Sequence, residues 1–323
     1  MEESIPSFCI AIASHLSNPK RIFYLLECLG SLLKQTTVIP IYLSISFEND
    51  DIKTSLLEGL GNNGYINHPL IHILVQSDKT PQMRHFLSIL DVLSMKREHK
   101  WIMFCDDDDT YDPIRVENLI KSIYIIQQQV TDPTKIFAGL YESHCEKDHR
   151  EHRHEYWCYC VHKPIMDRFY AAIMDHPDII DNKCCDVLFG EYLRRLSPDH
   201  FFGRLDMRLY QYRITENQDS VTGVIQARQS IYTKNEAHPP LGDPRLPDYI
   251  LNWNDYLYEN LDVYLHDVFL RTIVGCDMDY ILRMEFRNDY DLLPYVDECH
   301  ADKMREKHEY WRSVCAKLYD VKL

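Results

Sequence analysis

Strand-like and helix-like segments alternate along the first part of this 323-residue chain. Apolar runs of strand length and apolar residues at helical spacing follow one another at residues 8–13, 21–34, 39–47, 51–60, 70–75, 81–96 and 101–105. Parallel strands require crossover connections, which are usually helices. The alternation therefore predicts an α/β fold built on a doubly wound, mostly parallel mixed sheet of Rossmann-like type.

The remainder of the chain predicts a second part that is helical. Further strand patterns occur at 135–140, 156–161 and 202–213, with helical patterns at 164–174 and 185–196. A proline-rich stretch at 237–247 interrupts the pattern, and apolar residues from Ile250 to Val268 then keep helical spacing. We expect a catalytic domain over residues 1–230, a linker over 231–247 and a helical C-terminal extension over 248–323.

Four consecutive aspartates, residues 106–109, follow the apolar segment 101–105. Adjacent carboxylates repel one another and cannot be buried unpaired, so they predict a bound divalent cation. Asp112 and Pro113 have the pattern of an N-cap and a first helical residue, which predicts a helix from there to about residue 127. The run would then lie on a strand-to-helix turn, where open α/β sheets bind ligands. A solvated acidic turn that only caps a helix is the alternative.

The amino-acid composition disfavours several classes of binding partner. The formal net charge is −15, from 35 basic and 50 acidic side chains, which disfavours nucleic-acid polymers and anionic membranes. The N-terminus begins acidic, and no apolar run approaches the roughly 20 residues that span a bilayer. We therefore expect a cytoplasmic protein without a transmembrane segment. Eleven cysteines, an odd number, fit reduced thiols better than a disulfide framework.

Four motifs occur in an order and spacing that resemble family 2 glycosyltransferases of the GT-A fold, over roughly residues 7–225. They are Ser31-Leu32-Leu33-Lys34-Gln35 at the end of the first helix, Gln82-Met83-Arg84-His85, the aspartate run before Tyr111-Asp112-Pro113, and the acidic helix start at Cys185-Asp186-Val187-Leu188-Phe189-Gly190.

The resemblance implies a metal-dependent hexosyl- or pentosyltransferase. Such an enzyme moves a sugar from a nucleotide-sugar donor, for which we favour a UDP-sugar, to a hydroxyl of a glycan or other acceptor, here with inversion. It implies Mn²⁺ or Mg²⁺ held by an Asp-x-Asp motif, taken as Asp106 and Asp108, although Asp107-x-Asp109 also fits. It assigns the catalytic base to Asp186, with Glu191 as a weaker substitute; a carboxylate at a helix start that serves only as an N-terminal cap is the alternative.

The resemblance also implies which residues contact the nucleotide. In such enzymes the ends of the first two strands contribute, here Ala13, Ser14, Ser46 and Glu48, together with Asp106 and Asp107 of the acidic run. Arg84 would contact the phosphates through charge-assisted hydrogen bonds, and an exposed helix arginine without a role in the site is the alternative. Two departures are present: the second strand lacks the usual acidic pair at its end, and His85 stands where the family often has asparagine.

Two other functions stay open on the sequence. Asp106-x-Asp108-x-Thr110 after an apolar run also fits haloacid-dehalogenase-like phosphatases or phosphotransferases, with the first aspartate as nucleophile. That family places this motif on its first strand, whereas three strand-helix units precede it here. A non-catalytic nucleotide-sugar-binding protein is the second alternative.

Two segments suggest other roles. Histidines and cysteines between His144 and His162 lack the paired spacing of zinc sites, so we expect a polar loop there. Aromatic residues of the C-terminal extension, such as Trp253, predict packing against the catalytic domain and allow a homodimer.

Overall fold

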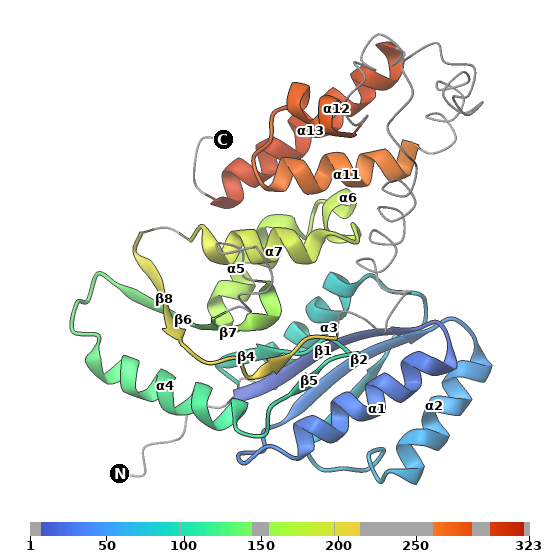
Figure 1. The fold of residues 1–323 in the computed structure, drawn as a ribbon, viewed down its shortest axis with the longest axis vertical. Helices are drawn as coiled ribbons and strands as arrows, with labels where there is room; N and C mark the ends of the chain where they lie inside the picture. Colours follow the sequence, from blue (N-terminus) through green and yellow to red (C-terminus); the bar gives the residue numbers. More distant parts are fainter. Residues whose placement is uncertain are drawn as a thin grey trace, which may run out of the picture. The chain divides into compact units, whose positions relative to one another are not determined.

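The structure is a computed structural model that describes residues 8–96, 99–143, 155–196, 198–213, 261–285 and 298–319 (Figure 1). The chain divides into two compact units, residues 1–213 and 214–323. The predicted linker at 231–247 lies outside the described residues, so the three predicted domain boundaries stay predictions.

The first unit follows the alternating order expected from the sequence. Its elements are β1 (Phe8–Leu16), α1 (Pro19–Leu33), β2 (Ile41–Phe47), α2 (Asp50–Asn62), β3 (Ile71–Val75), α3 (Gln82–Lys96), β4 (Trp101–Phe104), β5 (Thr110–Tyr111), α4 (Arg115–Gln129), β6 (Ile136–Glu142), η1 (Tyr156–Cys158), β7 (Tyr159–His162), α5 (Lys163–Ile173), α6 (Pro177–Ile180), α7 (Cys185–Arg194), β8 (His200–Leu205) and β9 (Tyr210–Gln211).

Seven strands form the main sheet, in the order β3-β2-β1-β4-β7-β6-β8. All neighbouring pairs are parallel except those of β7, which runs antiparallel to both β4 and β6. The two remaining strands, β5 and β9, form a small antiparallel pair directly after the aspartate run. The predicted α/β class with a mostly parallel mixed sheet is confirmed.

Helices cover both faces of the sheet. Right-handed crossovers place α1 and α2 on one face, and α3 must lie on the other because the chain turns back from β3 to β4 on the far side of β1 (Figure 1). The side chains agree with this, since His85 of α3 contacts Ser44 and Ser46 of β2. β1 is buried along nearly its whole length, as expected for a central strand covered twice.

Two local predictions are wrong. Helix α4 begins at Arg115 rather than after Asp112, because Asp112 opens a turn: its carboxylate accepts from the Ile114 amide at 3.1 Å and its carbonyl from the Arg115 amide at 3.0 Å. The segment predicted as a strand from residue 156 starts as a turn of 3₁₀ helix, η1, and becomes strand β7 only at Tyr159.

A buried ion pair connects the two-stranded β5–β9 sheet to the main sheet. Arg115 and Glu142 are both almost fully buried and form an ion pair through Arg115 Nε. The second carboxylate oxygen of Glu142 accepts from the backbone amides of Leu209 and Tyr210, at 2.9 and 3.1 Å. The Arg115 guanidinium also lies over the Tyr111 ring, 4.0 Å from its centroid. Together these contacts fix the position of the segment that follows the aspartates.

The second unit is helical over its described residues, which agrees with the helical extension expected there. It contains α11 (Leu261–Ile273), α12 (Met278–Glu285) and α13 (Glu298–Tyr319). Phe269 of α11 packs edge-on against Trp311 of α13, with ring centroids 5.1 Å apart. Across both units, the nine cysteines among the described residues are free thiols.

Candidate active site

The acidic turn follows β4 at the point where the sheet order reverses. Strands β2 and β3 lie beyond β1, whereas β7, β6 and β8 lie beyond β4. The crevice outside the carboxyl ends of such a pair is where open α/β sheets bind ligands. Residues 106–109 follow β4, and Ser14 lies near the end of the neighbouring β1. The predicted site residues of these two strands therefore meet at one edge.

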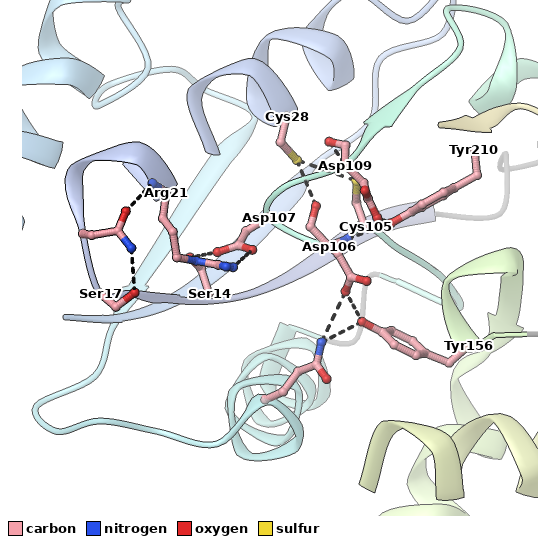
Figure 2. Close-up of polar contacts among 12 residues, drawn as sticks. Ser14, Ser17, Arg21, Cys28, Cys105, Asp106, Asp107, Asp109, Tyr156 and Tyr210 are labelled. Carbon is pink, nitrogen blue, oxygen red and sulfur yellow. Dashed lines mark hydrogen bonds and ion pairs between the residues drawn. The ribbon is translucent and has the colours of Figure 1, made fainter. Parts of the chain in front are cut away.

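Asp107 and Asp109 point into the protein. Asp107 is 4% exposed, and its two oxygens accept from Ser14 Oγ and Arg21 Nη2, each at 2.5 Å (Figure 2). Asp109 is 1% exposed and accepts from the Tyr210 hydroxyl at 2.8 Å and the Arg213 amide at 2.7 Å. Every carboxylate oxygen of this pair therefore has a partner within the chain.

Asp106 and Asp108 alternate with the buried pair and are half-buried. Asp106 Oδ1 accepts from the Tyr156 hydroxyl and from Gln82 Nε2, the latter at 3.3 Å. In Figure 2 Asp106 turns toward Tyr156, and Asp107 turns toward Arg21. The four carboxylates do not converge, and among the described residues no three His, Cys, Asp or Glu side chains are grouped to hold a metal ion.

Burial and mutual repulsion perturb the carboxylates of this turn. Burial, with the charges of Asp109 and Asp108, raises the pKa of Asp106 well above its ordinary value. Burial raises the pKa of Asp109 to about 8 and that of Asp107 to about 6, the latter against the opposing charge of Arg21. Closely spaced negative charges at a partly open edge favour a cation as neighbour.

The chemistry of the donor set fits a small divalent cation. Asp106 and Asp108 supply carboxylate oxygens, the hard donors that Mg²⁺ and Mn²⁺ prefer, and both are half-buried in the turn after β4. A site of one or two carboxylates suits a cation that keeps several waters and binds substrate phosphates. Asp107 and Asp109 already have a partner on each oxygen, so they are poorly placed to add ligands.

Four predicted nucleotide contacts lie together at the ends of β1 and β2. Ala13 and Ser14 of β1 are register neighbours of Ser44 and Ile45 of β2. Ser46 is buried and lies 3.0 Å from His15 Nδ1, while Glu48 accepts from the other ring nitrogen, Nε2, at 3.0 Å. Glu48 is thus the most accessible of the four, with 47% of its side chain exposed.

His85 lies in a buried polar network. Its two ring nitrogens lie 2.8 Å from Ser44 Oγ and 3.2 Å from Ser46 Oγ. Burial, with the nearby His15 charge, lowers the pKa of His85 to about 4. A neutral His85 therefore fixes Ser46, which in turn accepts from the Thr80 amide at 3.3 Å.

Arg84 is paired with another side chain in this structure. Its Nε and Nη2 bind both oxygens of Asp181, with 3.0 Å between Nη2 and Oδ2. Asp181 follows α6, so this pair links α3 to the segment before α7. Contact between Arg84 and a donor phosphate would require exchange of Asp181 and stays a prediction.

Asp186 lies in the first turn of α7, half-buried. It is not the N-cap residue, which is Cys184. Phe189, one turn later, packs against Phe104 of β4 with centroids 5.6 Å apart. Burial raises the pKa of Tyr156, and the negative charges of Asp106 and, to a smaller extent, Asp186 raise it further. The Asp186 charge therefore acts on the residue that binds Asp106. The start of α7 therefore lies near the acidic turn.

Glu191, the predicted substitute base, is engaged elsewhere. It is 1% exposed and forms ion pairs with Arg194 and Arg195, the latter at 3.0 Å. Of the two predicted carboxylates, Asp186 is the more exposed, since it is half-buried in the first turn of α7.

Sequence reasoning missed the residues that bind the aspartates. Arg21 and Gln82 lie in the first turns of α1 and α3, and Tyr156 and Tyr210 come from distant parts of the chain. A polar residue in the first turn of the helix that follows a strand was a usable signal for Arg21 and Gln82. The two tyrosines gave no such signal.

Within the described residues, no helix is both long enough and apolar enough to cross a bilayer.

No family model and no curated protein matches the sequence. Among solved structures, the chain is similar to Staphylococcus aureus TarS, with 13% identity and a TM-score of 0.45, covering 96% of this chain. The chain spans 55% of the length of TarS. It is also similar to the mannosyltransferase PcManGT from Pyrobaculum calidifontis in complex with GDP-Man and Mn²⁺, with 9% identity and a TM-score of 0.47, covering 98% of this chain and 86% of that one. At this level of similarity, neither structure assigns an activity.

Proposed function

We propose that this protein is a metal-dependent glycosyltransferase of the GT-A fold that uses a nucleotide-sugar donor. The observation that carries the proposal is that burial alternates along the acidic run, which lies at the switch point between β1 and β4. Asp107 and Asp109 are buried, while Asp106 and Asp108 are half-buried at the edge of the sheet where open α/β folds bind ligands. This supports the Asp106-x-Asp108 register over Asp107-x-Asp109.

Residues around this edge have complementary roles in the proposed reaction. Asp106 and Asp108 would hold Mn²⁺ or Mg²⁺, which supplies positive charge to a departing diphosphate. The nucleotide would lie against the ends of β1 and β2, near Ser14 and Glu48. Asp186 would take the proton from the acceptor hydroxyl, and inversion at the transferred sugar carbon follows if Asp186 is the base.

Position within the sheet supports the transferase over the phosphatase alternative. A haloacid-dehalogenase-like reading of Asp106-x-Asp108-x-Thr110 expects this motif on the first strand, whereas it follows β4, with β1, β2 and β3 preceding it. Thr110 lies in β5 and is paired with Gln211 of β9. UDP as the nucleotide, a hexose or pentose as the sugar, a glycan as the acceptor and a homodimer remain parts of the proposal.

The Asp106-x-Asp108 register predicts that Asp108, and not Asp107, is a metal ligand. We expect Asp108→Asn to weaken Mn²⁺ binding by at least about tenfold, since it removes one of two proposed carboxylate ligands, and to maintain or raise the melting temperature without metal, since it removes one of four mutually repelling charges. Asp107→Asn should instead lower that melting temperature, because it leaves Arg21 without its charge partner. Titration of Mn²⁺ into each variant, followed by electron paramagnetic resonance of the free ion, measures the first effect. Tight Mn²⁺ binding by Asp108→Asn would contradict the register.

A further inference from the structure

Tyr156 occupies a packed position beside the acidic turn. It is the first residue of η1 and is 1% exposed. Its ring lies edge-on to Phe86 of α3 and Phe104 of β4, with centroid distances of 5.7 and 5.5 Å, and tilted against Phe189 of α7 at 6.3 Å. Three elements of the site therefore fix the ring, and with it the position of the hydroxyl.

Gln82 sets the direction of the Tyr156 hydroxyl hydrogen. Gln82 Nε2 lies 2.8 Å from the Tyr156 hydroxyl and 3.3 Å from Asp106 Oδ1. As a metal ligand Asp106 must be ionised, and an ionised carboxylate only accepts hydrogen bonds, so in that form the amide presents its NH₂ group, and not its oxygen, to this pair. Because that NH₂ donates to the Tyr156 oxygen, the hydroxyl hydrogen is directed to Asp106. Two donors thus converge on one oxygen of Asp106.

We propose that Tyr156 and Gln82 are positioning residues that hold Asp106 in the orientation in which it binds the divalent cation. The inference rests on the proposed function. Donors that fix one oxygen of a metal-binding carboxylate restrict its rotation and leave the other oxygen for the metal, and such outer partners typically contribute about 10- to 100-fold to metal affinity. Neither residue touches a substrate in this scheme; both act through Asp106.

A purely structural role for Tyr156 is the competing explanation, and the chain offers a matched control. Tyr170 of α5 is also buried, and its hydroxyl donates to the backbone carbonyl of Met83 in α3 at 2.7 Å. Tyr156→Phe and Tyr170→Phe each remove one buried hydroxyl that binds near the start of α3. Only the first of them touches a carboxylate of the acidic turn.

The experiment titrates Mn²⁺ alone into the full-length wild type and each variant, with free Mn²⁺ measured by electron paramagnetic resonance. We expect Tyr156→Phe to raise the Kd for Mn²⁺ about 10- to 100-fold and Tyr170→Phe to leave it within about twofold. Gln82→Leu, which changes a half-buried residue and preserves the core, should raise it about tenfold.

The outcomes separate this inference from the proposed function. A wild type that binds no Mn²⁺ overturns the proposed function and this inference with it. A wild type that binds Mn²⁺ while both Tyr156→Phe and Gln82→Leu bind it equally well overturns only the positioning role. Equal weakening in Tyr156→Phe and Tyr170→Phe also overturns it, since the effect would then come from lost packing.

Discussion

Asp186→Asn is expected to lower the turnover number for sugar transfer by about 10²- to 10⁴-fold, the range that a positioned general base contributes. Asparagine has nearly the same shape but cannot accept a proton from the acceptor hydroxyl. Because Asp186 lies in α7 and the nucleotide would lie at the ends of β1 and β2, donor affinity should stay unchanged. Two measurements on the same preparations test this prediction. The turnover number with a nucleotide sugar should fall, and the affinity for the donor should stay unchanged.

A control is needed because an acidic residue in a first helical turn also stabilises the helix dipole, by roughly 0.3–1 kcal/mol. Glu117 occupies the first turn of α4 and binds Thr36 and Lys121, neither of which is a predicted site residue. Glu117→Gln should therefore keep wild-type turnover. Full turnover in Asp186→Asn would assign proton transfer to another group, and equal losses in both variants would assign the effect to helix stability.

Glu142→Gln is expected to destabilise the first unit by about 3–5 kcal/mol, the cost of removing one partner from a buried ion pair. The change leaves the Arg115 charge buried beside a neutral amide, and Arg115 Nη1 already has no hydrogen-bond partner. It also weakens the acceptor for the amides of Leu209 and Tyr210. Urea unfolding followed by tryptophan fluorescence measures the change in unfolding free energy.

The matched control for this loss is Asp167→Asn. It breaks the Lys163–Asp167 pair, whose carboxylate is 44% exposed, and exposed pairs contribute little to stability. We expect its unfolding midpoint to stay close to that of the wild type. If Glu142→Gln unfolds at the same midpoint as Asp167→Asn, the buried pair does not hold the β5–β9 segment as described.

The order of strands and helices could be predicted because the dominant forces act locally. Buried strands such as β1 are continuous apolar runs, and helices such as α1 repeat their apolar residues every three or four positions. The start of α4 could not be predicted, because the Asp112 amide donates to the Leu209 carbonyl, about a hundred residues later in the chain, and Asp112 lies in a turn before the helix. Pairing over that separation leaves no local signal.

The same limit applies to the site. The aspartate run indicated a cation site because four adjacent charges are costly whatever the fold. Which aspartates are buried depends on Arg21 and Tyr210, which lie 86 residues before Asp107 and 101 residues after Asp109. Likewise, Asp106 meets Tyr156 only because η1 packs between β4 and α7. Those contacts could be identified only from the structure.

Metal-dependent recognition of a nucleotide sugar is the central claim, and thermal denaturation of the wild type tests it most directly. A ligand that binds only the folded state raises the apparent melting temperature, by an amount set by its concentration relative to its Kd. A panel of UDP- and GDP-linked sugars, each with Mn²⁺ and with a chelator, should contain at least one that stabilises the protein only when Mn²⁺ is present. Absence of any Mn²⁺-dependent shift across the panel would contradict the account.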